Sequence, residues 1–231
     1  MATERDHVPP ACLFATPLPS DLITVPSCTR CNRAFGLDDV YFRDALAISS
    51  TDSSYPPEVK SLQRAMGRSL KRRQFRPPAA EMLRRAREVW MPLSSPITER
   101  AKLIPLDERR LARAVERIVV GLHFHETGRI LPKTHKPFVL HSSILKSVRP
   151  DHASSFHEIF GPLTSADWRA IGGKAFGYAF LPTTDDPDGS AWAMSFWGRV
   201  VFMSVVCSDD SHDCSSTMSD AGKRRKRAGT L

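Results

Sequence analysis

The sequence predicts an α+β protein in which helices precede an antiparallel sheet. Three observations along its 231 residues lead to this prediction. A short N-terminal segment joins strand-like residues to a Cys-x-x-Cys pair, residues 58–125 carry apolar side chains at helical spacing, and residues 137–206 are rich in aromatic and β-branched residues. Because the period changes from helical to strand-like once, the helices and strands are expected to be segregated along the chain.

Residues 1–48 are expected to form a small N-terminal module that ends in a helix. This helix is predicted over Leu37–Ile48, because Asp38 and Asp39 would then stand in its first turn, where carboxylates favour the helix dipole. The segment 49–57, which reads SSTDSSYPP, is predicted to be a turn-rich linker.

Residues 58–206 are expected to form an α+β domain. Its first part is predicted to be helical in EVKSLQRAMGRSLKRRQF, AAEMLRRAREVW and DERRLARAVERIVVGLHF. Its second part is predicted to form strands from KAFGYAFLP and AWAMSFWGRVVFMSVV, with turns at DDPDGS and WG. Residues 207–231 show no apolar periodicity and are expected to be a disordered basic tail.

The bulk composition is that of a globular protein with an excess of positive charge. With 41% hydrophobic and 25% charged residues, a chain of this length can bury a proper core. The net charge of +8 and the pI near 9.5 favour association with phosphate-rich polymers, although the run KRRKR at 223–227 supplies five of the positive charges.

The expected location is the cytoplasm, without membrane contact. No stretch reaches the roughly 18 apolar residues that would mark a membrane span, and MATERDHVPP lacks the pattern of a signal peptide. The five cysteines are an odd number in a chain without an export signal, which favours thiols used for metal binding or packing over a disulfide framework.

An acid and an imidazole stand side by side near the start of the chain. Asp6 and His7 precede Val8-Pro9-Pro10, at the expected end of a short strand. Neighbouring side chains of a strand point to opposite faces, and the prolines are expected to turn the chain so that the pair can act together. The carboxylate is a hard ligand for Mg²⁺ or a similar ion, and the imidazole can take a proton from a water that attacks phosphorus.

A Cys-x-x-Cys-Asn motif follows. Cys28 and Cys31 have the spacing at which two thiolates bind one Zn²⁺ from a tight turn. Asn32 would begin the helix and offer an amide oxygen to a cation that also meets the acid of the first strand. This is the arrangement of a one-metal phosphodiesterase, in which the ion stabilises developing charge. The alternative is a pair of reduced thiols in a loop.

Together these residues resemble the HNH (ββα-metal) endonuclease module, in the version found in uncharacterised bacterial proteins. In that version a D/E-H-V-x-P motif is followed by L-I-T-V-P-x-C-x-x-C-N and by a helix of the D-x-x-F-R kind. This chain has DHVPP, DLITVPSCTRCN and DDVYFR at the corresponding places. The resemblance covers residues 5–43 and continues more loosely through residues 116–132 and the strands of WAMSFWGRVVF.

The resemblance implies an N-terminal ββα-metal-like module that hydrolyses DNA phosphodiester bonds. Asp6 and Asn32 would hold one divalent ion, Mg²⁺ or Mn²⁺, and His7 would be the general base. Cys28 and Cys31 would contribute half of a structural zinc site.

The chain departs from the pattern of the family at two places. Modules of this kind have a first Cys-x-x-Cys upstream of the acid–His pair, whereas only five residues precede Asp6 here, and Asp21 stands nearest to the place of the middle Asn. A structural zinc with fewer than four ligands is incomplete, unless Cys12 replaces one of them. These departures suggest a shortened or inactive copy.

Further residues have two interpretations each. Lys71, Arg72 and Arg73, in the run SLKRRQFR, would lie along a phosphate backbone or on a solvated helix face. His123 and His125 could bind a metal together only in an extended segment, because positions i and i+2 do not share a helix face, so solvated or satisfied histidines are favoured.

Two other classes of function compete with the nuclease. One is a non-catalytic nucleic-acid-binding or protein-interaction protein, in which the helices of residues 58–125 and the C-terminal sheet carry the function. The other is a globular protein whose N-terminus only packs on its core. The sequence does not predict an oligomeric state.

Overall fold

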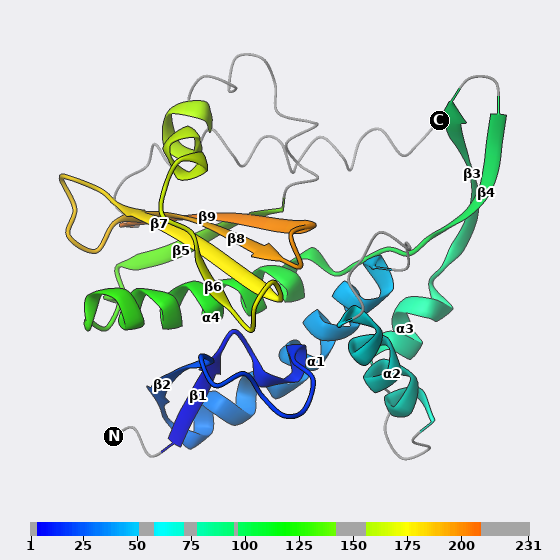
Figure 1. Ribbon diagram of the computed structural model, residues 1–231, viewed down its shortest axis with the longest axis horizontal. Coiled ribbons are helices and arrows are strands. Elements are labelled where there is room, and N and C mark those ends of the chain that lie inside the picture. Colours follow the sequence, from blue (N-terminus) through cyan, green and yellow to red (C-terminus); the bar gives the residue numbers. More distant parts are fainter. Residues whose placement is uncertain (1–3, 51–57, 72–77, 95–96, 142–155, 209–231) are drawn as a thin grey trace. The chain divides into compact units, whose positions relative to one another are not determined.

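A computed structural model describes residues 4–50, 58–71, 78–94, 97–141 and 156–208 (Figure 1). The chain forms two compact units: one comprises residues 1–6, 10–18 and 26–114, and the other comprises residues 7–9, 19–25 and 115–231. The predicted α+β class is confirmed, with a strand pair and helices followed by an antiparallel sheet. The predicted boundaries between module, linker, domain and tail stay a prediction.

The N-terminal segment is a strand pair followed directly by a long helix. Strands β1 (Glu4–Val8) and β2 (Ile23–Ser27) form a two-stranded sheet, with the short 3₁₀ helix η1 (Ala11–Leu13) between them in the chain. Helix α1 (Thr29–Ser49) follows β2 after one residue.

The start of this helix predicted near Leu37 is wrong, whereas the start expected at Asn32 from the Cys-x-x-Cys-Asn motif is close to the observed one. Helix α1 begins at Thr29, because the thiol of Cys28 accepts the N–H of Cys31 at 3.1 Å and caps the first turn. Asp38 therefore lies inside the helix, where it pairs with Arg110 rather than with the helix dipole.

Helices α2 (Val59–Leu70) and α3 (Pro78–Arg84) pack against α1. A buried ion pair lies where they meet, with Arg43 and Asp44 joined at 2.5 Å. The guanidinium of Arg43 also donates to Ser69 Oγ of α2 at 3.3 Å, and Asp44 accepts the backbone N–H of Ala79 in α3 at 3.3 Å. A buried charge needs partners of this kind, so the pair fixes the arrangement of the three helices.

The helix predicted through AAEMLRRAREVW is correct only in its first part. Helix α3 ends at Arg84, and β3 (Arg87–Ser94) and β4 (Ile97–Leu103) form an antiparallel hairpin with a sheet of its own. The apolar spacing of this stretch fits a helix, but the pairing of Trp90 with Arg100 across the hairpin gives its backbone different partners. The exposed ring of Trp90 lies under the Arg100 guanidinium, 5.2 Å from the ring centroid.

The C-terminal sheet has five antiparallel strands in the order β5-β9-β8-β7-β6. The predicted strands and both predicted turns are confirmed, and in the tight WG turn Trp197 and Gly198 have φ of 52° and 66°. Strand β9 runs to Ser208, so the first residues of the predicted tail belong to the sheet, and residues 209–231 lie outside the described residues. The strands are β5 (His135–His141), β6 (Arg169–Ile171), β7 (Phe176–Pro182), β8 (Ser190–Phe196) and β9 (Val200–Ser208).

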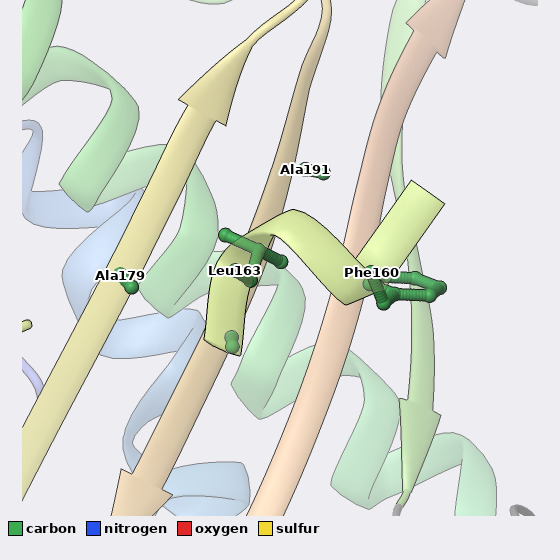
Figure 2. Packing of buried hydrophobic residues seen from close by; sticks show 5 residues of the cluster. Phe160, Leu163, Ala179 and Ala191 are labelled. Atoms are coloured by element: carbon green, nitrogen blue, oxygen red, sulfur yellow. The ribbon is translucent and has the colours of Figure 1, made fainter. Parts of the chain in front are cut away.

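The two faces of this sheet are covered differently. On one face, the helical residues 156–160 and the 3₁₀ helix η3 (Gly161–Thr164) lie over small side chains of β7 and β8. Figure 2 shows Leu163 above the strands of Ala179 and Ala191, and Phe160 beside the neighbouring strand β9. The opposite face carries large side chains such as Trp192, and Tyr178 donates from this face to Glu126 of helix α4 (Glu108–Thr127) at 2.5 Å.

No helix in the described part of the chain is both long and apolar enough to cross a membrane.

Candidate functional site

The first turn of α1 is tied to strand β1 by a side-chain hydrogen bond. Asn32 follows the Cys28 cap, and its backbone N–H bonds to the Cys28 carbonyl at 2.9 Å. From this position Asn32 Nδ2 donates to Glu4 Oε2 at 3.0 Å. Hydrogen bonds from Asn32 and then from Thr29 hold the pKa of the Glu4 carboxyl below its usual value of 4.5. Glu4 is thus an ionised partner of the first helical turn.

Sequence reasoning did not single out Glu4. The signal was present in the alternation Glu4-Arg5-Asp6, because residues two apart in a strand share a face. Glu4 and Asp6 therefore share the face of β1 that meets Asn32.

His7 lies on the other face of β1. The strand continues through Asp6 and His7 to Val8, so the prolines do not turn the chain between the acid and the imidazole, as the sequence had led us to expect. Alternation then places the His7 side chain opposite to that of Asp6. The structure thus brings Asn32 to the acidic face of β1 through Glu4, while it leaves the predicted acid–imidazole pair on different faces.

Cys28 and Cys31 lie together at the start of α1. The Cys31 thiol, and then the Cys31 backbone N–H, donate hydrogen bonds to the Cys28 sulfur, and these bonds lower the pKa of the Cys28 thiol below its usual value of 9.0. A thiolate is the form that binds zinc, so these two side chains suit two of the four positions of a structural zinc site.

The thiol of Cys12 is not presented as a third ligand. Its sulfur donates to the Asp39 carbonyl at 3.6 Å, and burial, together with the Asp39 carboxylate, raises its pKa to about 12. Cys12 is therefore held as a protonated thiol against α1. Among the residues that the structure describes, no group of three or more His, Cys, Asp or Glu side chains forms a metal site.

Asp21 acts as a backbone anchor. Both of its carboxylate oxygens accept the N–H of Gly172, each at 3.1 Å. Asp21, the residue nearest to the place of the middle Asn, thus bonds to the backbone of a residue 151 positions away.

Comparisons with protein-family models, with curated proteins and with solved structures found no match to this chain.

The predicted basic residues are only partly described. Lys71 is exposed at the C-cap of α2, and Arg72 and Arg73 lie outside the described residues. Three further cations of α2 were missed by sequence reasoning, although their spacing in VKSLQRAMGRSL reveals them. They are Lys60, Arg64 and Arg68, all exposed.

The two histidines of α4 do not form a metal site together. His123 is 1% exposed, neither of its ring nitrogens has a hydrogen-bond partner in the described structure, and His125 is exposed. The carboxylate of Asp188 lies 3.9 Å from Nε2 of His123. Burial lowers the pKa of His123 below 6.5, so its ring is neutral at neutral pH.

Besides the two thiols, the start of α1 and strand β1 carry side-chain oxygen atoms that could bind a ligand. The carboxylates of Glu4 and Asp6 and the amide of Asn32 are hard donors, the type that Mg²⁺ and Mn²⁺ prefer. A divalent ion held there would lie beside the positive end of the α1 dipole, so the carboxylates must supply the compensating charge.

Proposed function

We propose that this chain is an HNH-like, metal-dependent nuclease that hydrolyses phosphodiester bonds of DNA. The observation that supports it best is the hydrogen bond between Asn32 and Glu4. This bond holds the first turn of α1 against the face of β1 that carries Asp6, in a chain whose order of elements is strand, strand, helix.

In this proposal Asp6 and Asn32 hold a divalent cation, Mg²⁺ or Mn²⁺. When bound, such a cation would offset the negative charge that builds up on the nonbridging and leaving oxygens of the scissile phosphate. Glu4 is a positioning residue: it takes the NH₂ group of Asn32, which fixes the orientation of the amide and directs Oδ1 away from Glu4. Cys28 and Cys31 would give two thiolates to a structural zinc.

The role of His7 as general base is proposed from the resemblance. An imidazole suits the removal of a proton from water near neutral pH. Because strand alternation sets His7 opposite to Asp6, its role is tested separately from that of the cation ligands.

The test is nicking of supercoiled plasmid DNA in Mg²⁺ or Mn²⁺. Wild-type protein is expected to nick the plasmid, and Asp6→Ala or Asn32→Ala to lower the rate at least about 100-fold. His7→Ala is expected to lower it by about 10² to 10⁴, the range of general-base catalysis. His125→Ala is the matched control, since His125 is an exposed histidine of α4 and should have no effect.

Two results would contradict the proposal. Wild-type protein that binds DNA and does not cut it in either metal supports the non-catalytic alternative. Cleavage that survives Asn32→Ala places the reaction elsewhere in the protein. Zinc content of the purified protein, compared with that of Cys28→Ser, tests the thiolate pair independently.

A further inference from the structure

Helix α2 carries a stripe of four exposed cations. Lys60, Arg64, Arg68 and Lys71 are all exposed, and their spacing of four, four and three residues places them within about 80° of arc on the helix. Val59 and Leu62, which are buried, lie on the opposite side, toward the helix that α2 packs on. These four residues are called the α2 stripe below.

Among the described residues, no ion pair compensates the charge of the α2 stripe. No Asp or Glu occurs within α2, whose N-cap is Glu58, and none of the four cations has an ion-pair partner in the part of the chain that the structure describes. By contrast, Arg110 and Arg113 of α4 both bind Asp38, at 2.8 Å. Helix α2 thus differs from an ordinary solvated helix face, on which charges of both signs alternate.

Like charges at this spacing repel one another. Cations four residues apart on a helix destabilise it, so the stripe opposes the folding of α2 in the free protein. A ligand with evenly spaced negative charges would remove this repulsion by neutralising the whole stripe.

We propose that the α2 stripe binds the phosphate backbone of duplex DNA. The stripe spans about 16 Å along the helix axis, the length over which one strand of B-DNA carries about five phosphates. The proposal rests on the proposed function in taking DNA as the polyanion, and it deepens that function by giving the substrate a docking surface.

A membrane surface fits the stripe less well. Helices that lie on membranes insert an exposed apolar face beside their cations. The apolar residues Val59 and Leu62 of α2 are instead buried in the protein. Leu70, the last residue of the helix, is 38% exposed, and a single residue does not form such a face.

The experiment measures binding to a fluorescein-labelled 25-base-pair duplex by anisotropy, in EDTA and over a series of KCl concentrations. Lys60→Gln/Lys71→Gln is compared with Lys133→Gln/Lys174→Gln, two exposed lysines of the other unit, so that both variants lose the same charge. Each phosphate contact contributes about 0.9 to the slope of log K against log [salt]. The stripe variant is therefore expected to lower the slope by about 1.8, and the control variant to leave it unchanged.

A second pair of variants separates charge from folding. Arg64→Lys/Arg68→Lys keeps the charges and is expected to keep the slope, whereas Arg64→Gln/Arg68→Gln is expected to lower it by about 1.8. Circular dichroism of each variant verifies that α2 is still folded.

Several results would overturn the inference. These are no binding of the duplex by wild-type protein, equal slope changes in the stripe and control variants, or stripe-dependent binding to phosphatidylserine vesicles without binding to DNA. Binding in EDTA does not depend on cleavage, so the slope changes of the stripe variants are expected even if the nuclease proposal fails. Cleavage that is independent of the stripe would contradict only the present inference.

Discussion

Asn32 donates a hydrogen bond to Glu4 and joins the first turn of helix α1 to strand β1 over 3.0 Å. The two residues are 28 positions apart, and Glu4 keeps a lowered pKa because this amide, followed by Thr29, bonds to its carboxylate. The contact therefore has an electrostatic signature that can be measured without any ligand.

The first prediction concerns this signature. Asn32→Ala should raise the pKa of Glu4 toward 4.5, because the variant loses the hydrogen bond that lowers this pKa most. Thr29→Val should raise it less. An NMR titration of the Glu4 side-chain carbon measures both, and an equal effect of the two variants would contradict the ranking of the two bonds.

The second prediction concerns Gly121 of α4. A Cβ at this position would lie 2.5 Å from Cγ2 of Val8, which is itself buried, so Gly121→Ala should destabilise the protein by about 1–3 kcal/mol despite the better helix propensity of alanine. Gly36→Ala, in open space on α1, should instead stabilise it by about 0.5–1 kcal/mol. Urea unfolding measures both changes.

A double variant isolates the cause. Val8→Ala removes both γ carbons that the new Cβ would meet, so Val8→Ala/Gly121→Ala should be more stable than the sum of the single changes indicates. Additive single changes would show that the close approach of Val8 does not determine the cost.

The third prediction concerns His123. Its pKa in the folded protein lies below the unfolded value of 6.5, because burial disfavours the charged ring. Below pH 6.5 the unfolded chain therefore binds more protons at this residue than the folded protein does. The folded protein has its full stability above pH 6.5, and part of that stability is lost as the pH falls through the lowered pKa of His123. Acidification from pH 8 to 5 should destabilise the wild-type protein through this residue.

The variant His123→Leu should remove this pH dependence. It also removes two buried nitrogens without partners in the described structure, so it should stabilise the protein by about 1 kcal/mol at pH 8 and by more at pH 5. His125→Leu is the control, because His125 is exposed and should leave the pH profile unchanged. If the difference in melting temperature between His123→Leu and wild type is the same at pH 8 and at pH 5, the prediction is contradicted.

The fourth prediction concerns the two arginines that bind Asp38. Burial raises the pKa of Asp38, but hydrogen bonds from Arg113 and Arg110 outweigh it and keep this pKa below 3.8. The stabilisation is thus present above pH 3.8 and is lost as the pH falls through the lowered pKa. Asp38→Asn should lower the free energy of unfolding by about 1 kcal/mol at pH 7.

The two arginines should not be equivalent. Arg110 is less exposed than Arg113, and its guanidinium also lies 4.3 Å from the centre of the Tyr41 ring. Arg110→Met should therefore cost more than Arg113→Met, with the exposed Arg109→Met near zero. Equal losses for Arg110→Met and Arg113→Met in thermal unfolding would contradict this order.

The strands of the C-terminal sheet were predictable because local residues determine them. Aromatic residues recur in Phe176–Pro182 and Ser190–Phe196, valines recur in Val200–Ser208, and the WG turn has the positive φ values that suit a tight hairpin. The hairpin β3–β4 was missed, because the apolar spacing around Trp90 also fits a helix and only its pairing with Arg100 distinguishes the two.

The start of α1 was misplaced for a related reason. A thiol is not among the usual N-cap residues, so Cys28 gave no signal, and the aspartates at 38 and 39 suggested a first turn. The partner of Asp38 lies 72 residues away, at Arg110, and no local pattern reveals it. The candidate site shows the same limit, since the type and spacing of Asp6 and Asn32 could be seen in the sequence, whereas the contact of Asn32 with Glu4 depends on how β1 meets α1.

The order β5-β9-β8-β7-β6 leaves two outer strands that are poor templates for further pairing. Strand β6 has three residues, and Pro137 in β5 has no N–H to give to a neighbour. Short strands and proline are the features by which sheets avoid pairing edge to edge. The C-terminal sheet should therefore resist growth into fibrils, and its large aromatic core should stay within one molecule when the protein is concentrated.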